Sequence, residues 1–142
     1  LGCGLNPLDY IKLNKKAEYY CCHVNINEIN LVNRYFKKNK ICGKAFVFDL
    51  VFDDIHKLPD ADAVLLFRVL ESLEYYERDI SERILKNLKC KTIVVSFAKN
   101  VLSKKGNIRK KGRSWFRRIL GRLNYDYKVY DIGDEIFFVI RK

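Results

Sequence analysis

Strand-like and helix-like stretches alternate along this chain, and the alternation stops only near its end. Short apolar runs that are rich in aromatic or β-branched residues predict buried strands at residues 19–24, 45–51, 63–67 and 92–97. Residues 127–132 and 135–140 then alternate on either side of a short turn and predict an antiparallel hairpin. This order predicts an α/β fold, with a mostly parallel sheet, helices on both faces and an antiparallel last strand.

Helical periodicity separates the predicted strands. A short helix is expected to start at Pro7, and a clear amphipathic helix follows Asn27, which suits an N-cap position. Further helices are predicted at residues 76–88 and around the apolar pair Trp115 and Phe116. The terminal hairpin without a helix resembles the Rossmann-like methyltransferase plan more than a dinucleotide-binding domain.

The opening stretch Leu1-Gly2-Cys3-Gly4-Leu5-Asn6-Pro7 is the most informative motif. Two glycines separated by one residue suit a turn between a strand and a helix, where a ligand can approach the backbone. An ordinary turn is the alternative. Because the turn would follow a first strand, and because the chain contains no methionine, we expect most of that strand to lie upstream of Leu1.

Composition narrows the class of protein. A length of 142 residues predicts one domain, residues 1–142. No apolar run approaches the roughly 20 residues that cross a bilayer, and no signal-peptide pattern is present, so we expect a cytoplasmic protein. The five cysteines include no C-x-x-C pair, which favours buried, reduced thiols over a disulfide framework or a metal site. Neither His23 nor His56 has a convincing nucleophile beside it.

Positive charge is concentrated in one segment. The net charge is +11, and the span from Lys99 to Arg122 holds ten basic residues and no acid. Such a span suits a polyanion, although a run of lysines can also be an ordinary solvated face. We favour RNA as the partner, contacted by Lys104, Lys105, Arg109, Lys110, Lys111 and Arg113.

Candidate ligand-binding residues follow the predicted strands. Asn25 could accept hydrogen bonds from ribose hydroxyls, or it could simply be a loop residue or a helix cap. Asp49 could accept the amino group of an adenine; Asp54 is the second choice, and a solvated turn acid is the alternative. Phe67 could form an apolar wall beside the ligand, or it could be part of the core.

These residues together resemble the aminoglycoside-resistance methyltransferases (FmrO-like, Arm/Rmt type) that modify guanine N7 in the decoding site of small-subunit ribosomal RNA. The opening L-G-C-G-L-N-P is similar to the first motif of that family. The D-I-D motif of the family appears here as Asn25-Ile26-Asn27, with both acids replaced by amides. Its later motifs are similar to Leu65-Leu66-Phe67-Arg68-Val69-Leu70, to Ser96-Phe97-Ala98 with Val101-Leu102-Ser103, and to Trp115-Phe116. The resemblance covers essentially all 142 residues.

The resemblance implies a class I methyltransferase with a seven-stranded sheet, S-adenosylmethionine as donor and the small ribosomal subunit as partner. It also implies a helical region upstream. It places the donor against Gly2, Cys3, Gly4, Asn6, Asn25, Ile26, Asp49, Leu50 and Phe67. Two alternatives stay open: a methyltransferase for transfer RNA or another substrate, and a non-catalytic RNA-binding module, which the lost acid at Asn25 favours. The sequence leaves the oligomeric state undetermined.

Overall fold

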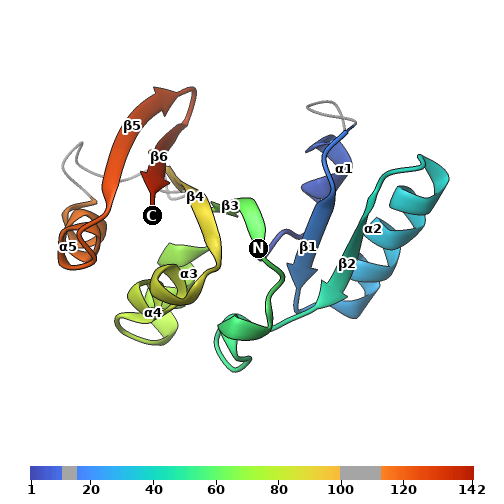
Figure 1. Cartoon of the computed structure of the whole chain (residues 1–142), viewed down its shortest axis with the longest axis horizontal. Coiled ribbons are helices and arrows are strands. Elements are labelled where there is room, and N and C mark those ends of the chain that lie inside the picture. The colour runs from blue at the N-terminus through green and yellow to red at the C-terminus, as the bar shows by residue number, and fades with distance from the viewer. Residues whose placement is uncertain (11–15, 100–112) are drawn as a thin grey trace, which may run out of the picture. The chain divides into compact units, whose positions relative to one another are not determined.

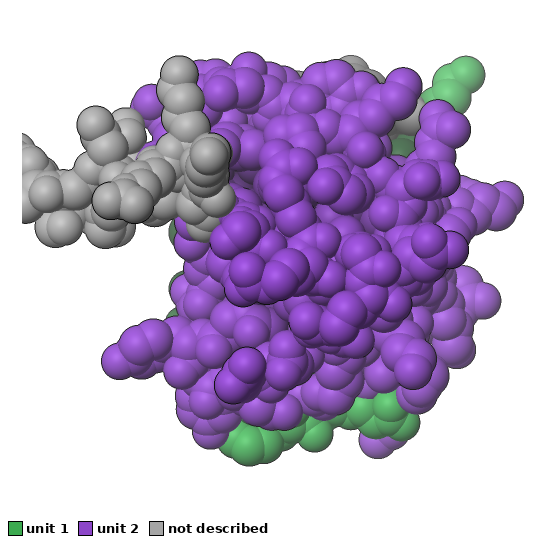
Figure 2. Space-filling view, turned by 90° about the vertical axis from the view of Figure 1, so that its left-hand side faces the viewer, with its two compact units in different colours: residues 1–54 green, residues 55–142 purple. Residues whose placement is uncertain are grey.

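The computed structural model describes residues 1–10, 16–99 and 113–142. These residues form two compact units, Leu1–Asp54 and Ile55–Lys142, which are coloured separately in Figure 2. The first unit contains a two-stranded sheet and the second a four-stranded sheet. The predicted α/β class is therefore confirmed, with six strands in the described part of the chain. No helix in that part is long and apolar enough to cross a bilayer.

The first unit is a β-α-β arrangement (Figure 1). Strand β1 (Tyr19–His23) pairs in parallel with β2 (Gly43–Val47), and helix α2 (Ile26–Lys38) connects them. The helix buries the predicted apolar face, which consists of Ile29, Val32 and Phe36. A parallel pair requires such a crossover connection, so the helix both joins the strands and covers them.

A side chain closes the outer edge of β2. Asn33 on α2 donates from Nδ2 to the backbone oxygen of Ala45 at 2.8 Å, and its Oδ1 accepts the backbone N–H of Ala45 at 2.9 Å. Both main-chain groups of Ala45 are thus bonded by one amide. The contact occupies the position that a further strand would take.

A short helix, α1 (Pro7–Tyr10), begins at Pro7 as predicted. The hydroxyl of Tyr35 on α2 donates to the backbone oxygen of Leu8 at 3.1 Å and links the two helices. The spacing of Leu8, Ile11 and Leu13 predicts that this helix continues beyond Tyr10, but residues 11–15 fall outside the described part of the chain.

The second unit contains the predicted hairpin. Strand β3 (Ala61–Phe67) pairs in parallel with β4 (Cys90–Ala98), and β6 (Glu135–Arg141) pairs antiparallel with β4. Strand β5 (Asp126–Ile132) completes the order β3-β4-β6-β5 (Figure 1). The antiparallel last strand is therefore confirmed, and it lies inside the sheet rather than at its edge.

Aromatic packing joins helix α5 (Ser114–Arg122) to this sheet. Phe97 of β4, Phe116 of α5 and Phe138 of β6 are all fully buried. Their ring centroids lie 5.0 to 5.8 Å apart in edge-to-face arrangements, the geometry that aromatic quadrupoles favour. Trp115 adds a contact to Phe97 at 5.7 Å. The apolar face predicted around Trp115 and Phe116 is confirmed.

The prediction of one helix over residues 76–88 is wrong at its start. The structure has two helices there, α3 (Leu70–Tyr76) and α4 (Ile80–Asn87), and a short 3-10 helix, η1 (Ile55–Lys57), was also not predicted. Asp79 separates α3 from α4 with a positive φ of 62°. The Glu74 carboxylate accepts the backbone N–H groups of Asp79 and Ser81 at 3.1 and 2.8 Å, which satisfies donors at the start of α4.

Two boundaries in the first unit also differ from the prediction. The N-cap of α2 is Asn25 rather than Asn27, because the Asn25 Oδ1 accepts the backbone N–H of Asn27 at 2.9 Å. The strand expected at residues 45–51 ends at Val47. Beyond it the Asp49 carboxylate accepts the backbone N–H of Val51 at 2.8 Å and bends the chain into a turn.

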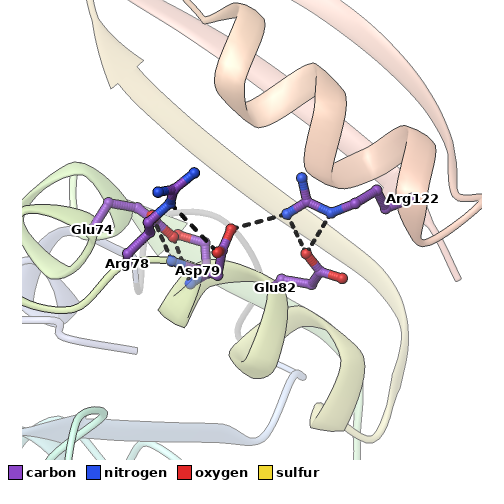
Figure 3. Close-up of polar contacts among 6 residues, drawn as sticks. Glu74, Arg78, Asp79, Glu82 and Arg122 are labelled. Carbon is purple, nitrogen blue, oxygen red and sulfur yellow. Dashed lines mark hydrogen bonds and ion pairs between the residues drawn. The ribbon is translucent and has the colours of Figure 1, made fainter.

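Ion pairs tie α5 to its neighbours. At its C-terminal end, Arg122 donates to Glu82 at 2.8 Å and to Asp79 at 3.0 Å, both at the start of α4 (Figure 3). Hydrogen bonding to Glu82 raises the pKa of the Arg122 guanidinium. Just before α5, Arg113 is only 7% exposed, and its guanidinium bonds Glu71 and the backbone oxygen of Ala98, each at 2.8 Å. The same group lies 4.9 Å from the centroid of the Phe97 ring.

Gly43 provides a test of the β1–β2 pairing. Its φ is +152°, and a Cβ there would lie 2.1 Å from the backbone oxygen of Tyr19. We expect Gly43→Ala to lower the free energy of unfolding by about 1–3 kcal/mol, measured by urea denaturation. Gly121→Ala is the control: on α5 its Cβ would meet no described atom within 4 Å, so this helical substitution should stabilise by about 0.5–1 kcal/mol. Unchanged stability of Gly43→Ala would contradict the observed pairing.

Arg113 provides a second test. Arg113→Met keeps much of the apolar stem but leaves Glu71 and the Ala98 oxygen without their donor. We expect a loss of about 1–3 kcal/mol in the free energy of unfolding. Arg118→Met, on the exposed surface of α5, should change stability by less than about 0.5 kcal/mol. Equal effects of the two substitutions would show that the buried contacts of Arg113 contribute nothing.

Candidate functional site

The glycine turn adopts the conformation that its sequence predicts. Gly2 and Gly4 have φ values of 59° and 50°, in the left-handed region that favours glycine. The backbone N–H of Cys3 donates to the oxygen of Cys22 at 3.0 Å, so the turn lies against the last residues of β1. Asn6 then closes the turn by donating its backbone N–H to Cys3 at 3.1 Å. The turn thus lies beside the carboxyl end of β1 and leads into α1.

The two strands of the first unit end side by side. His23 and Val47 are paired as the last residues of β1 and β2, and the Phe48 N–H donates to the His23 oxygen at 3.2 Å. Asn25 and Asp49 each follow within two residues of these strand ends. The structure therefore brings the predicted residues of the first unit to the end of the sheet where β1 and β2 stop. These residues are Gly2, Cys3, Gly4, Asn6, Asn25, Ile26, Asp49 and Leu50.

Cys3 and Leu50 could contact a ligand at this end of the sheet only through their backbone atoms, because both residues are buried. The two residues are only 8% and 5% exposed and belong to the core. Hydrogen bonding to Cys3, together with burial, raises the pKa of the Cys21 thiol. All five cysteines are free, and three are buried, but Cys42 is exposed and Cys90 is half-buried, so the expectation that every thiol is buried is wrong.

The Asn25 side chain is already engaged by its own helix. Its Oδ1 caps α2, and its Nδ2 makes a long hydrogen bond of 3.5 Å to Glu28 Oε1. The helix-cap alternative is thus confirmed for Asn25. Its predicted contact with a ribose stays a prediction.

Asp49 lies in a turn that carboxylates hold together. Its Oδ1 accepts the Val51 N–H, while its own N–H donates to the Asp53 carboxylate at 2.7 Å. Asp49 is half-buried, whereas Asp54, the second choice for the same role, is exposed. The geometry leaves Asp49 at the strand end as predicted, with one oxygen engaged in the turn.

Exposed apolar side chains gather around the same two strand ends. Val24 and Ile26 follow β1, Val47 ends β2, and Phe52, which is 75% exposed, lies in the turn beyond it. Exposed side chains of this size are a surface on which an aromatic ring can lie. Sequence reasoning identified Ile26 but missed the other three, although Val24 and Phe52 extend apolar runs past the ends of β1 and β2.

The predicted residues of the second unit have structural contacts. Phe67, at the end of β3, packs edge-on against Phe137 with ring centroids 5.8 Å apart. Arg113 is buried and bonded as described above. Lys99, at the start of the basic span, donates to the Gly133 oxygen at 2.5 Å and pairs with Asp131. The other predicted RNA contacts, Lys104, Lys105, Arg109, Lys110 and Lys111, lie outside the described residues.

No protein-family model matches this chain, and no curated protein matches it in sequence. Solved structures do match it. The 16S rRNA methyltransferase RmtF, in complex with S-adenosyl-L-homocysteine, has a TM-score of 0.86 and 23% identity, covering 99% of this chain and 54% of RmtF. The 16S rRNA methylase RmtB gives a TM-score of 0.79 at 19% identity, over 99% of this chain and 53% of RmtB.

The 16S rRNA methylase ArmA gives a TM-score of 0.77 at 24% identity and covers 99% of this chain and 70% of ArmA. The chain spans about half the length of RmtF and RmtB. At these identities the likeness establishes the fold. The resemblance predicted from the sequence motifs is confirmed at that level: the chain has the fold of S-adenosylmethionine-dependent methyltransferases, and its structural neighbours include enzymes of 16S rRNA.

Proposed function

We propose that the protein is an S-adenosylmethionine-dependent methyltransferase that modifies guanine N7 in small-subunit ribosomal RNA. The observation that carries the proposal is the fold shared with RmtF over 99% of this chain at a TM-score of 0.86. The left-handed glycine turn at the carboxyl end of β1 supports it, because open α/β sheets bind nucleotide-like ligands at such a turn. This substrate would place the protein in the cytoplasm.

The residues of the first unit fit such a cofactor. Gly2 and Gly4 carry no side chain, so a ligand can approach the backbone of the turn closely. The Glu28 carboxylate is near this backbone, since its Oε2 would lie 3.5 Å from a Cβ at Gly4. We propose that Gly2, Cys3, Gly4 and Asn6 hold the amino-acid side of the donor mainly through the backbone. Asn25, Ile26, Asp49 and Leu50 would surround its nucleoside. The apolar wall predicted at Phe67, which belongs to the second unit, stays a prediction from the sequence.

The chemistry requires little from the protein beyond orientation. When bound, S-adenosylmethionine supplies an electrophilic methyl group on a sulfonium. Guanine N7 has a lone pair and no proton to lose, so no residue of this chain has to act as a general base. Catalysis would rest on holding the base in line with the methyl group. This agrees with the absence of a convincing histidine relay in the sequence.

The RNA would bind along the basic span. We propose Lys104, Lys105, Arg109, Lys110 and Lys111 as contacts to RNA phosphates within the small ribosomal subunit. Arg113 is left out of this set, because its guanidinium is buried against Glu71, Ala98 and Phe97.

We further propose that residues 1–142 belong to one methyltransferase core with a seven-stranded sheet. Six strands are described. The seventh would precede Leu1 and lie along the edge of β1 that faces away from β2. Support comes from the Cys3 N–H, which already donates to the Cys22 oxygen at 3.0 Å along that edge.

The first measurement is calorimetric titration of S-adenosylmethionine into the full-length protein. We expect saturable binding with a dissociation constant in the micromolar range, followed by methyl transfer to isolated small ribosomal subunits. Methylation of transfer RNA but not of small ribosomal subunits would support the methyltransferase activity and contradict the proposed substrate. Absence of binding by a folded protein would overturn the proposal.

One observation favours a second candidate, a non-catalytic RNA-binding module. The Asn25 oxygen caps α2, and its amide carries no charge with which to hold a ribose. In that case the protein would bind RNA with the same salt dependence but would not bind the donor.

The basic span gives a separate prediction. Replacing Lys104, Lys105, Lys110 and Lys111 with glutamine should weaken RNA binding and reduce the slope of log affinity against log salt by up to about 2.8–3.6, since each of four phosphate contacts contributes about 0.7–0.9. Filter binding at several salt concentrations measures this slope. Donor affinity in the same variant is the control and should stay within about twofold. Equal losses of RNA and donor binding would mean that the span is structural.

A further inference from the structure

Glu28 directs a carboxylate at the glycine turn. It lies in the first turn of α2, and its side chain is 33% exposed. Its Oε2 is 3.5 Å from the position of a Cβ at Gly4 and 3.3 Å from His23 Nε2. Its Oε1 is 3.5 Å from Asn25 Nδ2. The side chain therefore stands between the turn, the end of β1 and the start of α2.

Glu28 has the spacing of a capping-box residue, three positions after the N-cap Asn25. In a capping box the acid would accept the backbone N–H of the N-cap residue. Among the described residues, the Glu28 carboxylate instead contacts the side chains of His23 and Asn25. Helix capping therefore does not explain the direction in which the carboxylate points.

The nucleoside of the proposed cofactor needs acceptors at this place. A ribose carries two neighbouring hydroxyls, and an ionised carboxylate accepts hydrogen bonds on both oxygens. The Asn25 oxygen is engaged in capping α2, so it is a poor substitute for an acid. We propose that Glu28 is the residue that accepts the ribose hydroxyls of S-adenosylmethionine, an inference that rests on the proposed function.

The amide at Asn25 and the acid at Glu28 are a matched pair in this structure. The Asn25 Nδ2 donates toward Glu28 Oε1. An aspartate at residue 25 would instead put a second carboxylate about as close to Glu28, and two like charges at that distance repel. The amide at residue 25 and the acid at residue 28 are thus compatible in this structure, in which the helix rather than the strand end carries the carboxylate.

The test is calorimetric titration of S-adenosylhomocysteine into the full-length protein. Glu28→Gln keeps the shape of the side chain and removes its charge, and we expect it to weaken binding at least about tenfold. Glu18→Gln is the matched control. Glu18 just precedes the opposite end of β1 and bonds Tyr20 at 2.8 Å, so its replacement should change affinity by less than about twofold.

A ligand without ribose hydroxyls separates cofactor binding from a structural role. For the 2′,3′-dideoxy analogue of S-adenosylhomocysteine, the wild type and Glu28→Gln should bind equally, because the proposed contact no longer exists. If Glu28→Gln lost the same factor with both ligands, the residue would act on the fold, and the proposal would be overturned.

The contact between Asn25 and Glu28 suggests a further set of variants for the same titration. Asn25→Asp alone should not strengthen binding, whereas Asn25→Asp combined with Glu28→Gln should recover most of the affinity that Glu28→Gln loses. Wild-type binding that Glu28→Gln leaves unchanged would overturn the role of Glu28 and leave the methyltransferase proposal standing. A folded wild type that binds no S-adenosylhomocysteine would overturn both.

Discussion

The candidate site depends on the close approach of β1 and β2 at Tyr19 and Gly43. Any side chain at residue 43 would collide with the Tyr19 backbone, so the glycine permits the parallel register that follows. That register ends both strands at the same level, with His23 paired to Val47. Asn25 and Asp49 therefore follow the two strands at the same level, each two residues after its strand end.

Two arginines at the ends of helix α5 hold it against neighbouring elements of the fold. The basic span reads in the sequence as one surface, but the structure uses its ends differently. Arg113 and Arg122 join the helix to neighbouring elements through carboxylates and a backbone oxygen, and Lys99 bonds the hairpin. The charges of Lys99, Arg113 and Arg122 are therefore already paired with carboxylates within the fold.

The elements were predictable where one periodicity dominated. The strands and the apolar faces of α2 and α5 follow directly from apolar runs and helical spacing. The break at Asp79 was not predictable, because it depends on Glu74 bonding backbone groups ahead of it. The same reason applies to the candidate site: the glycine turn, Asn25 and Asp49 could be predicted from their motifs. The direction of the Glu28 carboxylate depends on His23 and Gly4, which only folding brings near it.

The Asn33 amide has a consequence for how the first unit can associate. By bonding both main-chain groups of Ala45, it makes the β2 edge unreceptive to another strand. A further strand can therefore pair with this sheet only at β1, where the Cys3 N–H already donates to the Cys22 oxygen. Asn33 thus decides which edge of the sheet can accept another strand: the β1 edge, beside the glycine turn, and not the β2 edge.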